Sequence, residues 1–133
     1  MNDYRTVDAG RPWAARISYS RAVRRGDVVE VAGTSATSPV GDVVSPGDPY
    51  AQAVYILNEI RSALAELGAD LTDVVRTRAY LTSIDDWQDV GRAHGEAFGD
   101  TAPASTFVEI SRLMAPGLVV EFEATAIVSS VGS

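Results

Sequence analysis

Residues 48–68 carry the pattern of one long amphipathic helix, and strand-like runs precede and follow it. Asp48 is suited to cap this helix, and Pro49 suits its first position. Gly68 can end the helix in a left-handed conformation. The apolar side chains recur at spacings of three and four residues: Tyr50, Val54, Leu57, Ile60, Leu64 and Leu67. Such a helix must pack its apolar face on another layer, and the flanking runs predict that this layer is a sheet.

Short runs of alternating or β-branched residues, which are typical of strands, make up much of the remaining chain. Such runs are expected at 15–23, at 27–36, at about 73–82, in a stretch that opens at Pro103, and at 118–128. Arg24, Arg25 and Gly26 would form a tight hairpin between the first two. Residues 38–49 are rich in Pro, Gly, Ser and Asp and predict a loop, whereas residues 1–15 show no clear periodicity.

Alternation along two of these strands separates the side chains into two faces. In the last strand, one face holds Leu118, Val120, Phe122 and Ala124, and the other holds Val119, Glu121, Glu123 and Thr125. In 73–82, the two sets are Val74, Arg76, Arg78 and Tyr80, and Val75, Thr77, Ala79 and Leu81. A second helix is expected from about Asp85 to Phe98, ended by Gly99, with one face formed by Trp87, Val90, His94, Ala97 and Phe98.

The predicted order of elements is therefore β-β-α-β-α-β-β. This order indicates an α+β fold, with a mixed sheet and two helices on one face, and residues 1–133 are expected to form a single domain. No helix remains to cover the other face of the sheet, which is partly apolar. Because such a face is usually buried between subunits, we expect an oligomer.

The composition excludes several kinds of chemistry. The chain has no lysine among its 11 basic residues, no cysteine, and one histidine, His94. A lysine Schiff base, thiol catalysis, cysteine-bound metals and a multi-histidine metal site within one chain are therefore excluded. The net charge of −7 opposes nucleic-acid binding, and we interpret Arg21, Arg24 and Arg25 as a solvated basic turn. Since no membrane-spanning run or secretory signal is present, we expect a soluble, cytoplasmic protein with no membrane partner.

Glu121 and Glu123 are candidates for chemistry, because carboxylates inside a sheet are costly unless they are paired or hydrogen-bonded. They could act as an acid, a base or a ligand-orienting group in an interface cleft. They could equally form an ion pair between subunits with a strand arginine: Arg76, Arg78 or Arg112. The residues alone leave both alternatives open.

Three other positions are weaker candidates. His94, on the apolar helix face, is typical of a hydrogen-bonded structural residue, and a catalytic role is the less favoured alternative. Ser105 has no histidine or lysine in its own segment to activate it as a nucleophile. The segment around Gly33 resembles neither a phosphate loop nor a dinucleotide fingerprint. Backbone amides at the end of its strand could bind an anion or a carbonyl oxygen.

Three segments together resemble the Rid family, also called the YjgF or reactive intermediate deaminase family. They are residues 19–34 (YSRAVRRGDVVEVAGT), 74–99 (VVRTRAYLTSIDDWQDVGRAHGEAFG) and 103–126 (PASTFVEISRLMAPGLVVEFEATA). The last segment is the most specific, because it joins Pro-Ala, Val-Glu and Glu-x-Glu-Ala at family-like spacing. The resemblance implies a chorismate-mutase-like fold and a homotrimer with clefts between subunits. It also implies hydrolysis of enamines and imines made from amino acids, without a metal or organic cofactor.

In active members of that family, an arginine directly after Pro-Ala holds the substrate carboxylate with two hydrogen bonds. Ser105 stands at that position, so the chain resembles a subgroup that lacks the arginine. Glu121 matches the cleft glutamate that orients water or the imine nitrogen, and is the expected catalytic residue. The positions expected by resemblance to bind the substrate are Tyr19, Ala32, Gly33, Gly91, Ser105 and Phe107. Tyr19 and Gly33 retain the family residue, whereas the others depart from it.

Two functions follow from this resemblance. The favoured one is an enzyme that hydrolyses an imine or enamine, or transfers a proton in a tautomer, without an α-carboxylate on the substrate. Glu121 would position a water molecule or exchange a proton. The alternative is a non-catalytic trimeric module that binds a small metabolite, which the loss of the arginine favours. RNA cleavage, a third activity associated with the family, conflicts with the net charge of −7.

Overall fold

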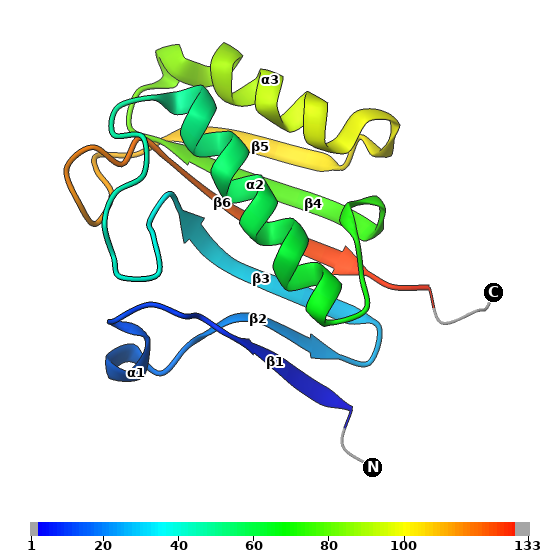
Figure 1. Cartoon of the computed structure of the whole chain (residues 1–133). Helices are drawn as coiled ribbons and strands as arrows, with labels where there is room; N and C mark the ends of the chain where they lie inside the picture. The colour runs from blue at the N-terminus through cyan, green and yellow to red at the C-terminus, as the bar shows by residue number, and fades with distance from the viewer. Residues whose placement is uncertain (1–2, 130–133) are drawn as a thin grey trace.

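The computed structural model describes residues 3–129 and shows a mixed sheet with helices packed on one face (Figure 1). The strands are β1 (Tyr4–Asp8), β2 (Ser20–Arg25), β3 (Val28–Ser35), β4 (Val74–Leu81), β5 (Ala104–Glu109) and β6 (Val120–Ile127). The helices are α1 (Ala14–Ile17), α2 (Pro49–Glu66) and α3 (Trp87–Phe98), with short 3-10 turns at Leu71–Asp73, Ile84–Asp86 and Gly99–Thr101. The six strands of this range lie in the order β1-β2-β3-β6-β4-β5, and only β4 and β5 pair in parallel.

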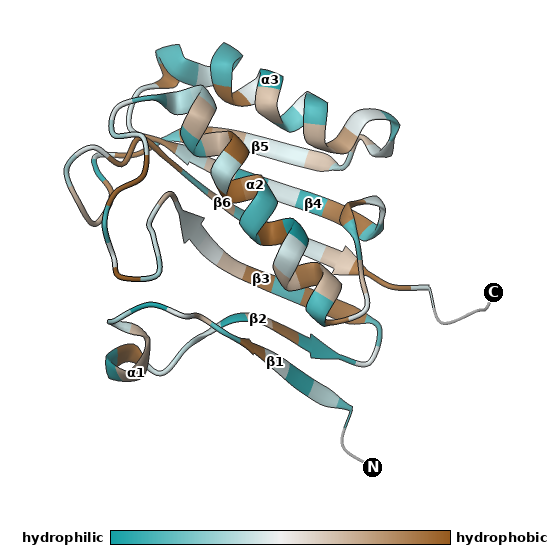
Figure 2. Ribbon diagram, viewed as in Figure 1, coloured by the Kyte–Doolittle hydropathy of each residue, from teal (hydrophilic) through white to brown (hydrophobic). Residues whose placement is uncertain are grey.

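This arrangement confirms the α+β fold predicted from the sequence. Both long helices lie on the same face of the sheet, as Figure 1 shows. Apolar residues of α2 and of the central strands β3 and β6 belong to one buried cluster. Figure 2 shows hydrophobic segments, in brown, along these elements. The core is therefore one layer of side chains between the sheet and the helix pair.

The N-terminal region differs from its sequence-based prediction. A strand was expected over 15–23, but Ala14–Ile17 is a short helix, which Ser18 ends in the left-handed conformation (φ 58°). Strand β2 begins only at Ser20. β1, where the sequence predicts no element, pairs antiparallel with β2. Val7 is its one buried residue, so β1 lacks the alternation that identifies a half-buried strand.

Helix α2 begins and ends as the sequence predicts. Asp48 caps it by accepting a hydrogen bond from a backbone N–H of the first turn, and Pro49 is its first residue. Gly68 follows it with a φ of +78°, which favours glycine. The buried face is formed by Gln52, Ala53, Ile56, Leu57, Ile60, Ala63 and Leu64. Tyr50 and Val54, from the predicted apolar set, are only half-buried.

Gln52 is a polar side chain in the core that joins α2 to two loops. Its amide nitrogen donates to the backbone oxygens of Val44, Ser45 and Gly117, at 3.1, 3.1 and 2.8 Å. Its amide oxygen accepts from the N–H of Val119 at 2.9 Å. Because a buried amide is costly to leave unpaired, these bonds hold the loop between β5 and β6 against the helix.

Strands β4 and β6 alternate as predicted, with one exception. Phe122, Ala124, Thr77, Ala79 and Leu81 are all buried. A β-bulge between Val74 and Arg76 turns Val74 into the core and leaves Val75 exposed, which reverses the prediction for these two residues. On the expected apolar face of α3, Val90 and Phe98 are buried, whereas Trp87, the first residue of the helix, is 53% exposed.

The other face of the sheet carries no helix from residues 3–129 (Figure 1). Val28 and Ile127 pair across β3 and β6 and are 44% and 51% exposed. The uncovered, partly apolar face expected from the sequence is thus present. Among the residues described, no helix has the length and apolar character needed to cross a bilayer.

Candidate functional site

The residues expected to form the site lie in two groups on opposite faces of the sheet. The first group lines a hollow of about 180 Å³ on the uncovered face: Tyr19, Ala32, Gly33 and Glu121. The second group, Ser105 and Phe107 on β5, contacts side chains on the helix-covered face. Because the sheet separates the two groups, one chain does not bring all the expected residues together.

We call the first group, with its neighbours Trp13 and Arg21, the glutamate half-site. Gly33 belongs to a β-bulge of β3, between Val31 and Thr34. The Glu121 side chain lies directly over Gly33, since a Cβ atom added there would come within 2.7 Å of Oε2 and 3.0 Å of Cδ. The bulge and the missing side chain therefore create the space that the carboxyl group occupies.

The Glu121 carboxyl has no hydrogen bond or ion pair to any residue within 3–129. Burial raises its pKa above the ordinary value of 4.5, and the nearby Glu123 raises it further, while Arg21 lowers it. A half-buried carboxyl with a raised pKa and no internal partner is available to bind a ligand or to exchange a proton.

Arg21 organises the polar groups beside this carboxyl. Its Nη1 atom donates to the Gly33 carbonyl oxygen and to Thr34 Oγ1, both at 3.0 Å, and its Nη2 atom donates to the Tyr19 hydroxyl at 3.2 Å. Trp13 Nε1 also donates to that hydroxyl, at 3.0 Å. The Tyr19 oxygen thus accepts two hydrogen bonds, which leaves its hydrogen for a ligand.

The position of Arg21 corrects a sequence-based interpretation. We expected Arg21, Arg24 and Arg25 to form a solvated turn, but Arg21 is only 7% exposed. Arg24 donates to the carbonyl oxygen of Leu67 at 2.7 Å, and the exposed Arg25 lies over the Tyr4 ring. Charge along the sequence does not reveal burial, because a side chain at a strand position can face either side.

We call the second group the serine half-site and define it as Ser105, Thr77, His94 and Phe107. Thr77 Oγ1 lies 2.7 Å from Ser105 Oγ and 2.8 Å from His94 Nε2, so one chain of hydrogen bonds joins the three side chains. Phe107 and Phe122 contact the His94 ring, with centroids 5.9 and 6.0 Å away. Burial lowers the pKa of His94 below 6.5. The imidazole that Ser105 lacks in its own segment is therefore supplied by α3, through Thr77.

Gly91 and Arg92 lie near this half-site on α3. Gly91 is half-buried, and a Cβ atom added there would meet no atom within 4 Å. Arg92 follows Gly91 on α3 and is exposed. Its guanidinium lies 3.7 Å from the centroid of the Tyr50 ring and 3.6 Å from the Asp89 carboxylate, so both interactions turn it toward the helix surface.

The structure separates the two strand glutamates by their contacts. Glu123 accepts a hydrogen bond from the Tyr80 hydroxyl at 2.8 Å, and Arg78 approaches it within 3.9 Å. Of the two alternatives, the ion pair describes Glu123, although its partner is an arginine of the same chain. Glu121, which has neither contact, is the candidate for chemistry.

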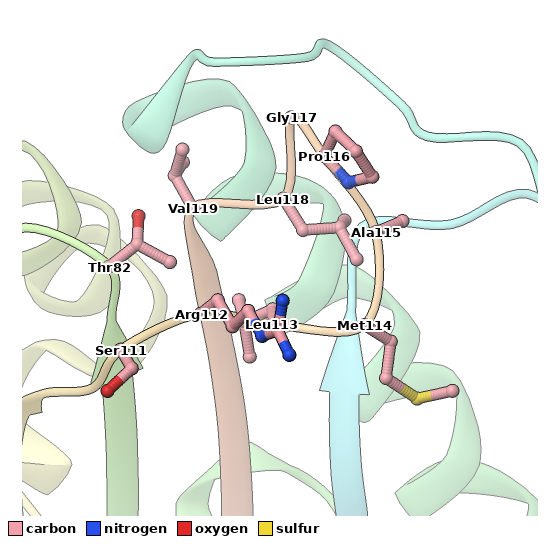
Figure 3. A pocket seen from close by; sticks show the side chains of 10 residues that line it. All are labelled: Thr82, Ser111, Arg112, Leu113, Met114, Ala115, Pro116, Gly117, Leu118 and Val119. Carbon is pink, nitrogen blue, oxygen red and sulfur yellow. The ribbon is translucent and has the colours of Figure 1, made fainter.

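A larger hollow, of about 680 Å³, lies in the loop between β5 and β6 (Figure 3). Backbone and mostly apolar side chains line it, with Arg112 as its charged residue, and none of the expected site residues belongs to it. Met114 lies at the edge of this hollow beside β3 and also lines the glutamate half-site. The loop that Gln52 holds in place therefore supplies an apolar wall next to Glu121.

Comparisons with known proteins agree with this fold. A family model described as Endoribonuclease L-PSP matches residues 10–128. The chain belongs to the YjgF/RidA/L-PSP family. Rv2704 from Mycobacterium tuberculosis, described as a member of the YjgF/YER057c/UK114 family, is 43% identical in its crystal structure, with a TM-score of 0.85 over 94% of this chain and 99% of that one. This likeness confirms the chorismate-mutase-like fold that the resemblance implied.

Two further relatives extend the comparison. SCO2049 of Streptomyces coelicolor is 36% identical over 130 residues, which are 97% of this chain and 96% of that protein. RidA from an Antarctic Psychrobacter is 26% identical, with a TM-score of 0.81 over 93% of this chain and 99% of the other. The family relationship therefore covers nearly the whole chain.

Sequence reasoning missed four contributors to the two half-sites of this family member: Trp13, Arg21, Thr77 and Met114. The only available signal was the placement of Arg21 and Thr77 on expected strands. Their contacts depend on pairing between distant segments, which local periodicity does not report. No cluster of three or more acidic or histidine side chains in the described part of the chain is arranged to hold a metal ion.

Proposed function

We propose that this family member is an enzyme that hydrolyses an imine or enamine lacking an α-carboxylate. The observation that carries the proposal is the Glu121 carboxyl, held over Gly33 without an internal partner and beside the Tyr19 hydroxyl. Ser105 supports the second part of the proposal, because its hydroxyl supplies neither the charge nor the two-pronged geometry that a carboxylate requires.

The chemistry needs one proton-exchanging group. An enamine reacts as its imine tautomer. The Glu121 carboxylate accepts a proton from a water molecule as the water oxygen bonds to the carbon of the C=N group, and Glu121 then returns this proton to the nitrogen. Glu121 next takes the proton of the new hydroxyl and transfers it to the amine, so that a C=O bond forms as the C–N bond breaks and ammonia leaves. The raised pKa of Glu121 brings its proton exchange closer to neutral pH, where a catalytic acid or base is most effective. The Tyr19 hydroxyl donates a hydrogen bond to the substrate and orients it.

We also propose that the active cleft forms between subunits of a homotrimer. The glutamate half-site of one subunit would face the serine half-site of its neighbour. Support comes from the placement of the two half-sites on opposite faces of the sheet, and from the apolar residues on the uncovered face. Such an assembly would enlarge the hollow of about 180 Å³ into a site closed from both sides.

A non-catalytic binding module is the second candidate, and the neutral side chain at Ser105 favours it. Such a module would hold a small metabolite in the same cleft without hydrolysis. RNA cleavage is disfavoured, since the net charge of −7 opposes binding to a phosphate backbone.

The test is ammonia release from freshly generated imines, with and without an α-carboxylate, measured above the uncatalysed rate. We expect acceleration of the imines without a carboxylate. Glu121→Gln should lower kcat by at least about 100-fold, because it removes the proton-exchanging group. Glu123→Gln is the matched control and should retain most activity, since Glu123 is held by Tyr80 and Arg78. No acceleration by the wild-type protein would leave the binding module as the function.

A further inference from the structure

We propose that Ser105, Thr77 and His94 form an uncharged subsite that recognises a neutral polar group of the ligand, such as a carboxamide or a ketone. This inference rests on the proposed function and names the class of its substrate: the imine of a neutral amino compound, such as an amino-acid amide.

The three side chains are joined in a definite order from the interior to the surface. His94 Nε2 lies 2.8 Å from Thr77 Oγ1, which lies 2.7 Å from Ser105 Oγ. Thr77 is completely buried, whereas Ser105 is exposed. Ser105 therefore forms the outer end of a hydrogen-bonded chain whose inner members are fixed by packing, which holds its hydroxyl in place for a ligand.

The surroundings of His94 keep the subsite uncharged. The side chains that contact the ring are Phe98 of α3, Thr77 of β4, Phe107 of β5 and Phe122 of β6. None of them carries a charge, and burial disfavours the imidazolium form, which agrees with the lowered pKa of His94. Since the ring is neutral at pH 7, no cation lies behind Ser105.

The arginines on neighbouring elements are engaged elsewhere. Arg76 lies on the uncovered face of β4, where its Nη2 atom donates to Thr106 Oγ1 at 2.7 Å. Arg92 of α3 stacks on Tyr50 and pairs with Asp89. Neither guanidinium is directed at the Ser105 hydroxyl, so a carboxylate at this subsite would lack the charge-assisted hydrogen bonds that it needs within this chain.

The hydrogen-bonded series of His94, Thr77 and Ser105 can offer either a donor or an acceptor to a ligand. A hydroxyl both donates and accepts, and a neutral imidazole nitrogen can do either, depending on its tautomer. If His94 Nε2 donates, Thr77 donates to Ser105, and the Ser105 hydrogen is free for a carbonyl oxygen. If the chain runs the other way, Ser105 Oγ accepts from a ligand N–H. A carboxamide, which offers both a carbonyl oxygen and an N–H, fits either arrangement.

The experiment compares 2-oxopropanamide with 2-oxopropanoate as product-like probes, by NMR titration of the full-length protein. We expect the amide to bind at least about tenfold more tightly than the acid, and to shift the ring nitrogen signals of His94. Ser105→Ala and Thr77→Val should each weaken amide binding by about tenfold. Thr77→Ser, which keeps the hydroxyl, should bind the amide as the wild type does. Thr106→Ala, the adjacent hydroxyl on the opposite face of β5, is the control and should bind as the wild type does.

Two results would overturn the inference: tighter binding of the acid than of the amide, or amide binding that Ser105→Ala leaves unchanged. Ser105 is exposed, so its variant should fold even if Thr77→Val does not.

Binding and turnover also separate the two proposals. Amide binding that depends on Ser105, without any imine hydrolysis, would refute catalysis and keep the subsite. Hydrolysis that depends on Glu121 but not on Ser105 would refute the subsite and keep catalysis.

Discussion

The glutamate and serine half-sites differ in how their polar groups are satisfied. In the glutamate half-site, Arg21 and Trp13 donate hydrogen bonds to the Tyr19 hydroxyl, but the carboxyl of Glu121 has no hydrogen bond or ion pair within residues 3–129. In the serine half-site, Ser105 is joined through Thr77 to His94, and the group is neutral. Under the proposed function, this difference corresponds to a division of roles, in which the carboxyl of Glu121 would react and the hydroxyl of Ser105 would recognise the ligand.

The largest expected effect tests whether the two half-sites work together across subunits. Glu121→Gln disables one half, and Ser105→Trp should block the other by bulk, so each variant alone should be nearly inactive. The two variants are then unfolded, mixed in equal amounts and refolded. Half of the subunits carry an intact Glu121 and the other half an intact Ser105, so about a quarter of the clefts should combine the two intact half-sites. Ammonia release from the mixture measures this recovery.

No recovery in the mixed protein, despite formation of hybrid oligomers, would show that the two half-sites do not meet across an interface. Light scattering that gave a monomer at micromolar concentration would have the same meaning. Either result would confine the chemistry to the hollow around Glu121.

A smaller effect is expected from the glycine under the carboxyl. Gly33→Ala should lower kcat by roughly 10- to 100-fold, because the new Cβ atom displaces the Glu121 carboxyl from its position. The fold should persist, since the displaced group is the end of a flexible side chain. Enzyme kinetics measure the loss of kcat, and chemical unfolding of the same variant measures whether its stability is retained.

Gly95→Ala is the matched control, because a Cβ atom at this exposed position of α3 meets nothing within 4 Å. It should raise the free energy of unfolding by about 0.5–1 kcal/mol through helix propensity and leave turnover unchanged. Wild-type kcat in Gly33→Ala would contradict the requirement for a fixed carboxyl.

The smallest expected effect is the pH dependence of stability, which should have opposite signs in the two half-sites. Burial lowers the pKa of His94 in the native state, so the unfolded chain binds its proton more tightly. The free energy of unfolding is therefore not reduced by His94 above pH 6.5, and it falls as the pH drops from this value toward the native pKa. His94→Gln should reduce the loss of stability between about pH 7.5 and pH 5.5, as measured by denaturant unfolding.

For Glu121 the native pKa is raised, so the native state binds the proton more tightly. Stability should fall as the pH rises from 4.5 through the native pKa. Glu121→Gln should thus stabilise the protein at neutral pH, and this gain should disappear below pH 4.5. The stability gained by His94→Gln should grow as the pH falls, and the stability gained by Glu121→Gln should grow as the pH rises. If both gains changed with pH in the same direction, burial would not be the cause of both shifts.

Much of the fold could be predicted because its signals are local. The cap at Asp48, the spacing of apolar residues in α2 and the alternation in β6 all depend on neighbours within a few residues. The errors arose where local pattern and tertiary context disagree. β1 is an exposed edge strand without alternation, and a bulge exchanged the faces of Val74 and Val75.

Element order and motif spacing were enough to predict the α+β fold class and the family. They also marked Glu121 as the candidate catalytic residue, which stays a prediction. The folded structure was needed to show that Arg21 is buried beside Glu121, that Thr77 joins Ser105 to His94, and that the two half-sites face opposite sides of the sheet. These contacts join strands and helices far apart in the chain. They are set by strand order and register, which bring distant residues together without leaving a local pattern in the sequence.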